Sequence, residues 1–405
     1  MTPISIRFRG SQNPNYFNTA GTGQVPNEIS SVAAKARRAF DEEGAFSRHA
    51  NTLREEILTH TRQSISKLID AKPVEIALAN NATDGIISVV QAIDIQPPAR
   101  IWTGSEEHPS FNLPVSLLQA TGAQISRVDP YRPPEDQSLG PPPDWIMVSF
   151  TGYLSGRNIH RGWIDYANKH NVDLFIDATQ SVGLTKISVK ELGCAALVST
   201  GHKWLHGPLG TGFLFVRENS MDKFPRKAHG WRAIEAIDTE FKLAGDARLF
   251  EGGTVDWGAF AGLALACEWA ADEAFRHEIQ KARAERSNLC IAHLADLDCI
   301  DLYHENPGFL SIQAKRNHTF DANALVQELS ATTGFDIKPF DRVEHPRGAL
   351  RVSFSPFNKQ EDSKRLGSVL RTLIEQRVAP LCCSARSRPS GKRDTAGAGL
   401  DGRLK

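Results

Sequence analysis

The chain contains the stretch Ser199-Thr200-Gly201-His202-Lys203-Trp204-Leu205-His206-Gly207-Pro208, which decides its fold. This stretch begins where a short apolar run, residues 195–198, ends. Upstream, Asp177 closes another apolar run in the same way. An ammonium group loses hydration when it is held at the end of a buried strand. We therefore expect the pKa of Lys203 to fall and its free amine to become nucleophilic toward aldehydes.

Lys203 and Asp177 each have a commoner explanation when taken alone. A lysine at a strand end is usually a solvated surface residue, and an aspartate there is usually a turn residue or a helix cap. Here both come with specific neighbours and in a specific order along the chain. An acidic residue at a strand end is the partner that a cationic pyridine nitrogen needs. The pair predicts an enzyme that carries pyridoxal 5′-phosphate (PLP) as a Schiff base on Lys203.

Residues 177–217 read DATQSVG, then STGHKW, then GPLGTGFLFVR, and they resemble the class V aminotransferases. That group includes cysteine desulfurases, selenocysteine lyase, cystine lyases and isopenicillin N epimerase. Further matching segments are residues 16–20, 81–84, 107–108, 248–254 and 350–354. The resemblance covers roughly residues 15–375. It implies an α/β protein of the fold type I PLP-dependent transferases, with a mostly parallel seven-stranded sheet in a large domain and a smaller α+β C-terminal domain.

The hydrophobic pattern of the chain predicts the same class of fold. Short apolar runs alternate with amphipathic stretches, which predicts strands separated by helices and hence a mostly parallel sheet. The predicted strands are residues 75–79, 100–102, 124–128, 145–148, 173–176, 196–198 and 212–216. Helical patterns cover residues 83–93 and 163–170, and a long helical region covers residues 258–292. Beyond it we expect strands near residues 309–314 and 350–354, and helices near 321–331 and 359–376.

The domain boundaries follow from these patterns. Residues 1–25 form an N-terminal segment, 26–270 the large PLP-binding domain and 271–380 the small C-terminal domain. Residues 381–405 form a polar, basic tail with almost no large apolar side chains. Such a segment cannot bury enough surface to fold alone, so we expect it to be disordered.

Composition excludes several classes of partner. The chain has 47 Lys and Arg residues and 47 Asp and Glu residues. This balance gives no net positive potential that would attract nucleic acid. The first residues, MTPISIRFRG, lack the apolar core of a signal peptide, and no run approaches the length of a membrane span. The six cysteines show no metal-ligand spacing. We expect a cytoplasmic protein with reduced thiols and no metal site.

The resemblance implies how the cofactor phosphate is held. Ala82 and Thr83 follow a predicted strand and begin a helix, where backbone N–H groups suit a phosphate. The same pattern is also typical of an ordinary helix N-cap. Thr200 and His202 add donors. Thr254 comes from the neighbouring subunit, so the resemblance implies a homodimer with active sites at the subunit interface.

The resemblance also implies roles around the pyridine ring. His108 stacks on the ring and, as a neutral imidazole, can move protons to and from the substrate. Asp177 keeps the ring nitrogen protonated, and Gln180 donates to the phenolic oxygen of the cofactor. With Lys203, His108 and Asp177 make up the predicted catalytic set.

Arg351 matches the arginine that pairs with the substrate carboxylate in the family that this chain resembles, and a planar guanidinium suits bidentate binding of a carboxylate. Asn18 and Arg48 are expected to border the substrate pocket. Tyr153 marks a departure, because the family usually has an asparagine near this position. A phenol there implies a reshaped pocket or a new acid/base group.

A second departure concerns sulfur. Cysteine desulfurases carry a cysteine in the loop before the carboxylate-binding arginine, and residues 334–347 contain none. Members of the family that lack this cysteine but keep the GHKW and RVSF motifs often expel sulfur without a persulfide. The resemblance therefore implies a C–S lyase that acts by β-elimination on a cysteine conjugate or cystine-like amino acid. The alternatives are an epimerase, an aminotransferase or a decarboxylating enzyme of secondary metabolism. A non-catalytic PLP-binding protein is the remaining alternative.

Overall fold

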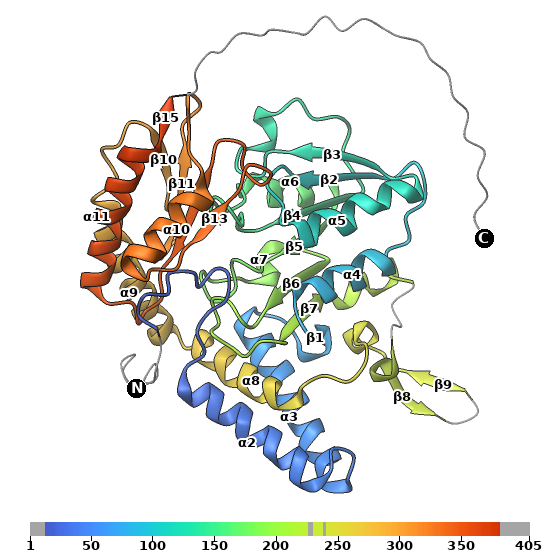
Figure 1. Cartoon of the computed structure of the whole chain (residues 1–405). Helices are drawn as coiled ribbons and strands as arrows, with labels where there is room; N and C mark the ends of the chain where they lie inside the picture. Colours follow the sequence, from blue (N-terminus) through green and yellow to red (C-terminus); the bar gives the residue numbers. More distant parts are fainter. Residues whose placement is uncertain (1–12, 226–229, 238–239, 381–405) are drawn as a thin grey trace, which may run out of the picture.

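The computed structural model describes residues 13–225, 230–237 and 240–380. A seven-stranded sheet lies at its centre, with the strand order β1-β7-β6-β5-β4-β2-β3 (Figure 1). Its strands are β1(Ile76–Ala79), β2(Arg100–Gly104), β3(Gln124–Val128), β4(Trp145–Ser149), β5(Asp173–Asp177), β6(Ala196–Thr200) and β7(Gly212–Val216). The strands from β6 to β3 pair in parallel, and only β7 runs against its neighbours β1 and β6. The predicted mostly parallel sheet is confirmed.

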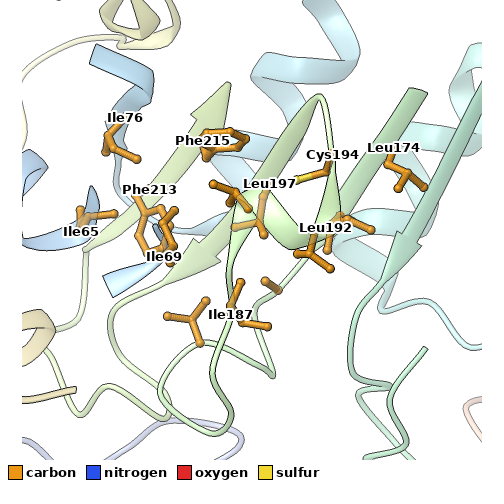
Figure 2. Close-up of a cluster of buried hydrophobic side chains, with 14 of the residues drawn as sticks. Ile65, Ile69, Ile76, Leu174, Ile187, Leu192, Cys194, Leu197, Phe213 and Phe215 are labelled. Atoms are coloured by element: carbon orange, nitrogen blue, oxygen red, sulfur yellow. The ribbon is translucent and has the colours of Figure 1, made fainter. Parts of the chain in front are cut away.

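Helices cover both faces of this sheet because successive side chains of each strand point to opposite faces. One face packs against α3(Arg48–Leu68), α6(Gly162–His170) and α8(Trp257–Ala271). The other packs against α4(Ala82–Ala92) and α5(Pro109–Leu117). Figure 2 shows part of the first core, where Leu197 and Phe213 of the sheet lie among the side chains of Ile65, Ile69 and Ile187. Burial of both faces explains why these strands read as near-continuous apolar runs.

A second, antiparallel sheet has the order β10-β11-β14-β13 and forms the smaller α+β unit (orange to red in Figure 1). Its strands are β10(Ile300–Tyr303), β11(Phe309–Ala314), β13(Lys338–Phe340) and β14(Ala349–Ser353). One face packs on α10(Ala322–Thr333) and α11(Gln360–Arg377). On the other face, Phe309 packs with Trp204 and Phe340 packs with Leu154, both of the large unit. This contact sets the position of the site.

The predicted helical region at residues 258–292 is two helices, α8 and α9(Glu273–Ile291). They are separated at Asp272, whose side chain accepts a hydrogen bond from the backbone N–H of Phe275 and caps α9. The N-terminal helix α2(Asn27–Glu43) packs on α8. The remaining elements are α7(Val189–Leu192), β8(Ile234–Ile237), β9(Phe241–Leu243), β12(His318–Thr319), β15(Ala379–Pro380) and the short helices η1(Pro73–Glu75), η2(Leu118–Thr121), η3(Pro134–Asp136), η4(Glu218–Lys223), η5(Trp231–Ala233) and η6(Ala247–Phe250).

The predicted tail, residues 381–405, lies outside the described residues, as do residues 1–12. The predicted domain boundaries at residues 25, 270 and 380 stay a prediction. Within the part of the chain that the structure describes, no helix combines the length and apolar character of a membrane span. Over the same residues, no cluster of His, Cys, Asp and Glu side chains is arranged to ligate a metal ion.

Candidate active site

A cavity of about 210 Å³ opens at the carboxyl ends of β4, β5 and β6, beside the first turns of α4 and α5. This is the edge at which parallel sheets bind ligands. Nine of the residues predicted for the site line it: Ala82, Thr83, His108, Tyr153, Asp177, Gln180, Thr200, His202 and Lys203. The sequence motifs, which lie far apart along the chain, therefore meet in one cavity.

Lys203 lies three residues after the end of β6 and is held by its neighbours in a fixed backbone turn. The backbone N–H of Gly23 donates to the His202 carbonyl over 2.7 Å. A Cβ at Gly23 would lie 2.2 Å from the Lys203 carbonyl oxygen, so only glycine permits this approach. Burial, and then the charge of Arg351, lower the pKa of Lys203 to about 8, although Asp177 opposes the shift. In a usable fraction of the molecules, the Lys203 side chain is therefore a free amine near neutral pH.

Asp177 ends β5 and lies buried at the wall of the cavity. Its Oδ1 accepts a hydrogen bond from the backbone N–H of Thr179 over 2.8 Å. Burial raises the pKa of Asp177, and the hydrogen bonds from Thr179 and the charge of Lys203 oppose the rise. Among the described residues, no cationic side chain forms an ion pair with Asp177, and Lys203 acts on it through its charge alone. A buried carboxylate in this state suits a cationic N–H group in the cavity.

His108 caps the N-terminus of α5, and its Nδ1 accepts from the backbone N–H of Ser110 over 3.1 Å. Burial, followed by the charges of Lys203, Arg351 and Lys338, lowers the pKa of His108 to about 4. The ring is therefore neutral near pH 7, with its proton on Nε2 because Nδ1 is an acceptor. The Tyr153 ring packs edge-to-face on it, with 5.1 Å between centroids.

The N-terminus of α4 forms one end of the cavity. Asn81 caps this helix by accepting from the Asp84 N–H over 2.9 Å, and the amides of Ala82 and Thr83 are in the first turn, whose N–H groups have no partner within the helix. Across from them, the Thr200 hydroxyl lies 2.7 Å from Nδ1 of His202. The Thr200 hydroxyl also donates to the Thr211 carbonyl over 3.1 Å, so the free donors at this end of the cavity are the amides of the first turn of α4. Such a group of donors suits a phosphate.

Gln180 has its side-chain amide orientation fixed by two partners. Its Oε1 accepts from the indole N–H of Trp204 over 2.9 Å, and its Nε2 donates to the Ala20 carbonyl over 2.9 Å. An amide nitrogen carries two hydrogens, so one is left for a ligand in the cavity. Gln180 also links the Asp177 loop to the Lys203 loop.

Arg351 lies on β14 at the substrate side, outside the residues that line the cavity itself. Its Nη1 donates to the Tyr153 carbonyl over 2.6 Å, and its Nη2 lies 3.4 Å from Oδ1 of Asn18. The guanidinium is buried, and its Nε has no partner among the described residues. Burial lowers the pKa of Arg351 to about 10, which still leaves it charged. An unpartnered, charged N–H of this kind suits a carboxylate.

Comparison with known proteins identifies the family. The family model for "Aminotransferase class-V" matches residues 15–366. The chain belongs to this family. A probable cysteine desulfurase of Borreliella burgdorferi is 24% identical over 394 residues, covering 89% of this chain and 92% of that protein. A cysteine desulfurase of Escherichia coli O157:H7 is 23% identical, covering 88% and 93%.

Solved structures agree on the class V fold. The cystine C–S lyase C-DES, in complex with its reaction product cysteine persulfide, has a TM-score of 0.80 at 22% identity, covering 90% of this chain and 99% of that chain. The E. coli cysteine desulfurase CsdA has a TM-score of 0.77 at 19% identity, covering 92% and 98%. The predicted fold type I architecture is confirmed.

Class V aminotransferases are PLP-dependent, and the cavity fits that cofactor. The donors at the start of α4 suit its phosphate, the buried Asp177 carboxylate suits its ring nitrogen, and the Lys203 amine suits its aldehyde. This class V enzyme is thus PLP-dependent, as the sequence predicted.

Two predicted site residues lie elsewhere in this chain. Arg48 is the first residue of α3, is exposed, and is not among the residues that line the cavity of its own chain, so its predicted place at the pocket border stays a prediction. Thr254 is also exposed and outside the cavity lining. Its predicted contribution to the site of a neighbouring subunit stays a prediction.

Sequence reasoning gave no role to Glu106 and Glu107, which precede His108. Glu107 is buried and accepts from the backbone N–H and the hydroxyl of Ser149, and its burial raises its pKa to about 8. Glu106 accepts from the backbone N–H groups of Leu154 and Ser155, over 3.0 and 2.7 Å, and so holds the loop that carries Tyr153. Consecutive carboxylates directly before a motif histidine were the signal that could have found them.

Arg283 is another functional residue that the sequence did not reveal. It extends from α9, is fully buried, and donates to the carbonyls of Gly183 and Trp204 over 2.8 and 3.2 Å. Its Nη2 lies 3.1 Å from Nε2 of His206. Arg283 therefore ties the helix that leads to the small unit to the loop that carries Lys203.

Proposed function

We propose that this enzyme is a C–S lyase that cleaves S-substituted cysteines by β-elimination, without forming a persulfide on the enzyme. The observation that carries the proposal is the state of its thiols. The loop between β13 and β14 contains no cysteine. Of the described cysteines, Cys194, Cys267 and Cys290 are buried, and burial raises the pKa of all three. Cys299 is only partly buried, and burial raises its pKa too, whereas Cys382 and Cys383 lie outside the described residues. Thiols with raised pKa values are poor nucleophiles, which supports departure of the sulfur together with its substituent.

Bound PLP supplies an electron sink that stabilises negative charge at the substrate Cα. The amine of Lys203 takes the Cα proton, since its lowered pKa leaves it partly unprotonated near neutral pH. The electron pair of the Cα–H bond forms the Cα–Cβ double bond, and the pair of the Cβ–S bond leaves with the sulfur as a thiolate. Water then converts the three-carbon fragment to pyruvate and ammonia. The step needs no oxidant or reductant.

The other residues orient the substrate and hold protons. Arg351 binds the α-carboxylate through its unpartnered Nε, with Asn18 beside it. Asp177 would provide the negative charge for the ring nitrogen of the cofactor, and the neutral ring of His108 would lie beside the cofactor with its Nε2–H as a donor. Burial raises the pKa of Tyr153 to about 12, so its hydroxyl stays protonated and is available to donate to the departing sulfur.

Product analysis tests this proposal. The holoenzyme is incubated with a panel of S-substituted cysteines, and the products are identified by mass spectrometry. We expect thiol, pyruvate and ammonia in equal amounts. A D-amino acid, a keto acid that retains sulfur, or an aldehyde with released carbon dioxide would support epimerisation, transamination or decarboxylation instead. These reactions share the first steps at Lys203 and Arg351, and they differ in which Cα bond breaks and where the proton returns.

We also propose that the working unit is a homodimer in which Thr254 serves the partner's cofactor phosphate. Its exposure, outside the cavity of its own chain, supports this arrangement. Lys203→Ala and Thr254→Val chains are each expected to have impaired activity alone. Co-expressed as mixed dimers, they form one site with both residues intact, so activity should rise above that of either variant. No recovery in verified mixed dimers would contradict the shared site.

A further inference from the structure

A second cation lies beside Arg351 on the small sheet. In the antiparallel pair of β13 and β14, Lys338 is the direct partner of Arg351. Directly opposed residues of such a pair project from the same face of a sheet, and Phe340 projects from that face too because it lies two residues further along β13. This is the face that packs on the large unit, whereas Leu350 and Val352 point into the core under α10 and α11.

The ring of Phe340 connects Lys338 with the active site. The Lys338 Nζ lies 5.3 Å from the ring centroid, and the Arg351 guanidinium carbon lies 5.6 Å from it. The Tyr153 ring packs on the same ring at 5.7 Å, and Tyr153 lines the cavity and contacts His108. Lys338 and Arg351 therefore approach one apolar ring next to the cavity, on the side where the substrate carboxylate is expected.

Glu344 accompanies Lys338. Its carboxylate lies 3.6 Å from the Lys338 Nζ, an ion pair longer than a hydrogen bond, and the two side chains are 27% and 39% exposed. The backbone N–H of Glu344 donates to Asp341 Oδ1 over 3.0 Å, which fixes the start of this loop. Glu344 also lies close enough for its charge to oppose the burial-driven fall in the pKa of Arg351 and to add to the burial-driven rise in the pKa of Tyr153. A positive and a negative group thus stand together, accessible and loosely paired, beside the carboxylate-binding arginine.

We propose that Lys338 and Glu344 form a subsite for a second amino-acid group at the far end of the sulfur substituent, with the distal carboxylate on Lys338 and the distal ammonium on Glu344. This inference rests on the proposed function, because it concerns the substituent that leaves with sulfur. The substrate class is therefore a sulfur-linked pair of amino acids, and a cysteine with a simple alkyl substituent is a poorer substrate.

Charge balance favours this occupant. The α-carboxylate of the substrate matches Arg351, while Lys338 and Glu344 already offset each other. An uncharged substituent would gain nothing from the pair, and a substituent with only a carboxylate would face Glu344 as well as Lys338. A zwitterionic group matches both charges, and the Phe340 ring between them and Arg351 suits the apolar link.

Equilibrium binding tests the subsite without turnover. The holoenzyme is titrated with diaminosuberate, aminosuberate and aminooctanoate, which have equal chain length and lack a leaving group at Cβ. Diaminosuberate carries both distal charges, aminosuberate only the carboxylate, and aminooctanoate neither. Dissociation constants come from calorimetry and from the cofactor absorbance. We expect diaminosuberate to bind at least about tenfold more tightly than aminooctanoate, which corresponds to one hydrogen bond between charged groups.

Variants assign the effect to the two residues. Lys338→Met should reduce the preference for diaminosuberate over aminooctanoate, because only the contact between the distal ammonium and Glu344 remains. Glu344→Gln should abolish the preference for diaminosuberate over aminosuberate. The control Lys359→Met changes an exposed lysine before α11 and should leave all three constants unchanged. Equal binding of the three ligands by the wild-type protein, no binding of diaminosuberate, or an unchanged preference in Lys338→Met would each overturn the subsite. If the subsite behaves as expected but no thiol is released from S-substituted cysteines, the proposed function fails and the subsite stands.

Discussion

Replacing Arg351 with methionine separates substrate binding from proton transfer. Methionine fills much of the same buried space but carries no charge and no donor. The structure leaves Nε of Arg351 for the substrate carboxylate, since Nη1 is used by the Tyr153 carbonyl. A hydrogen bond between charged groups contributes about 1.5–3 kcal/mol, so losing one should raise KM about 10- to 150-fold.

Arg351→Met should also change the pH dependence. The charge of Arg351 is the second cause of the lowered pKa of Lys203, after burial. Without it the pKa of Lys203 rises, a smaller fraction of the amine is free at neutral pH, and the rate at saturating substrate reaches its maximum at higher pH. Arg351→Lys keeps the charge and loses the planar fork, so it should raise KM while leaving the pH profile close to that of the wild type.

The assay compares S-substituted cysteines with the matching cysteamine derivatives, which lack the α-carboxylate. Values of kcat and KM are measured across pH for the wild type and both variants, and PLP content and thermal midpoint serve as controls for folding. Arg351→Met should affect KM for the cysteines much more than for the cysteamine derivatives. An equal rise for both substrate types would refute the assigned contact and indicate that Arg351 only supports the Tyr153 loop.

Three other predictions concern single residues. Lys203→Ala should abolish turnover and the visible absorbance of lysine-bound PLP, and wild-type spectra with retained turnover would remove Lys203 from its role. Asp177→Asn should still bind PLP but lose most of its rate, since the ring nitrogen loses its charge partner; an undiminished kcat in single-turnover and steady-state assays would show that Asp177 acts elsewhere. Burial lowers the pKa of His206 to about 3. Below about pH 6.5 the unfolded chain protonates this histidine while the native state keeps it neutral, so the free energy of unfolding decreases on acidification. The thermal midpoint of His206→Gln should therefore fall less steeply than that of the wild type between about pH 6.5 and 4, and parallel curves would contradict this.

The large sheet and the cofactor side of the site could be predicted from sequence because their signals are local. Asp177 directly follows an apolar run and Lys203 lies five residues after one, and parallel strands bring their carboxyl ends to one edge whatever the details of packing. The seven apolar runs predicted the bounds of the seven strands to within about two residues, because this pattern is also local in the sequence.

The substrate side depends on contacts between distant segments, which the sequence does not reveal. Arg351 contacts the Tyr153 carbonyl across 198 residues of chain, and the contact exists because the small sheet packs on the large unit. Arg283 reaches the Lys203 loop from α9 by a similar long-range contact, in a helix whose start at Asp272 was hidden inside a continuous helical pattern. Arg48 was expected to border the substrate pocket and lies at the exposed start of α3, so its position depends on how two subunits pack, which one sequence does not reveal.

The central claim, elimination of sulfur without an enzyme persulfide, is tested most directly in a variant whose six cysteines are all replaced by serine or alanine. Packing losses at the buried Cys194 and Cys267 require a check of PLP content and thermal midpoint first. In a well-folded variant we expect the rate of thiol and pyruvate release to stay close to that of the wild type. Loss of that activity on removal of one cysteine, together with a persulfide on that cysteine in the wild-type protein by mass spectrometry, would contradict the account.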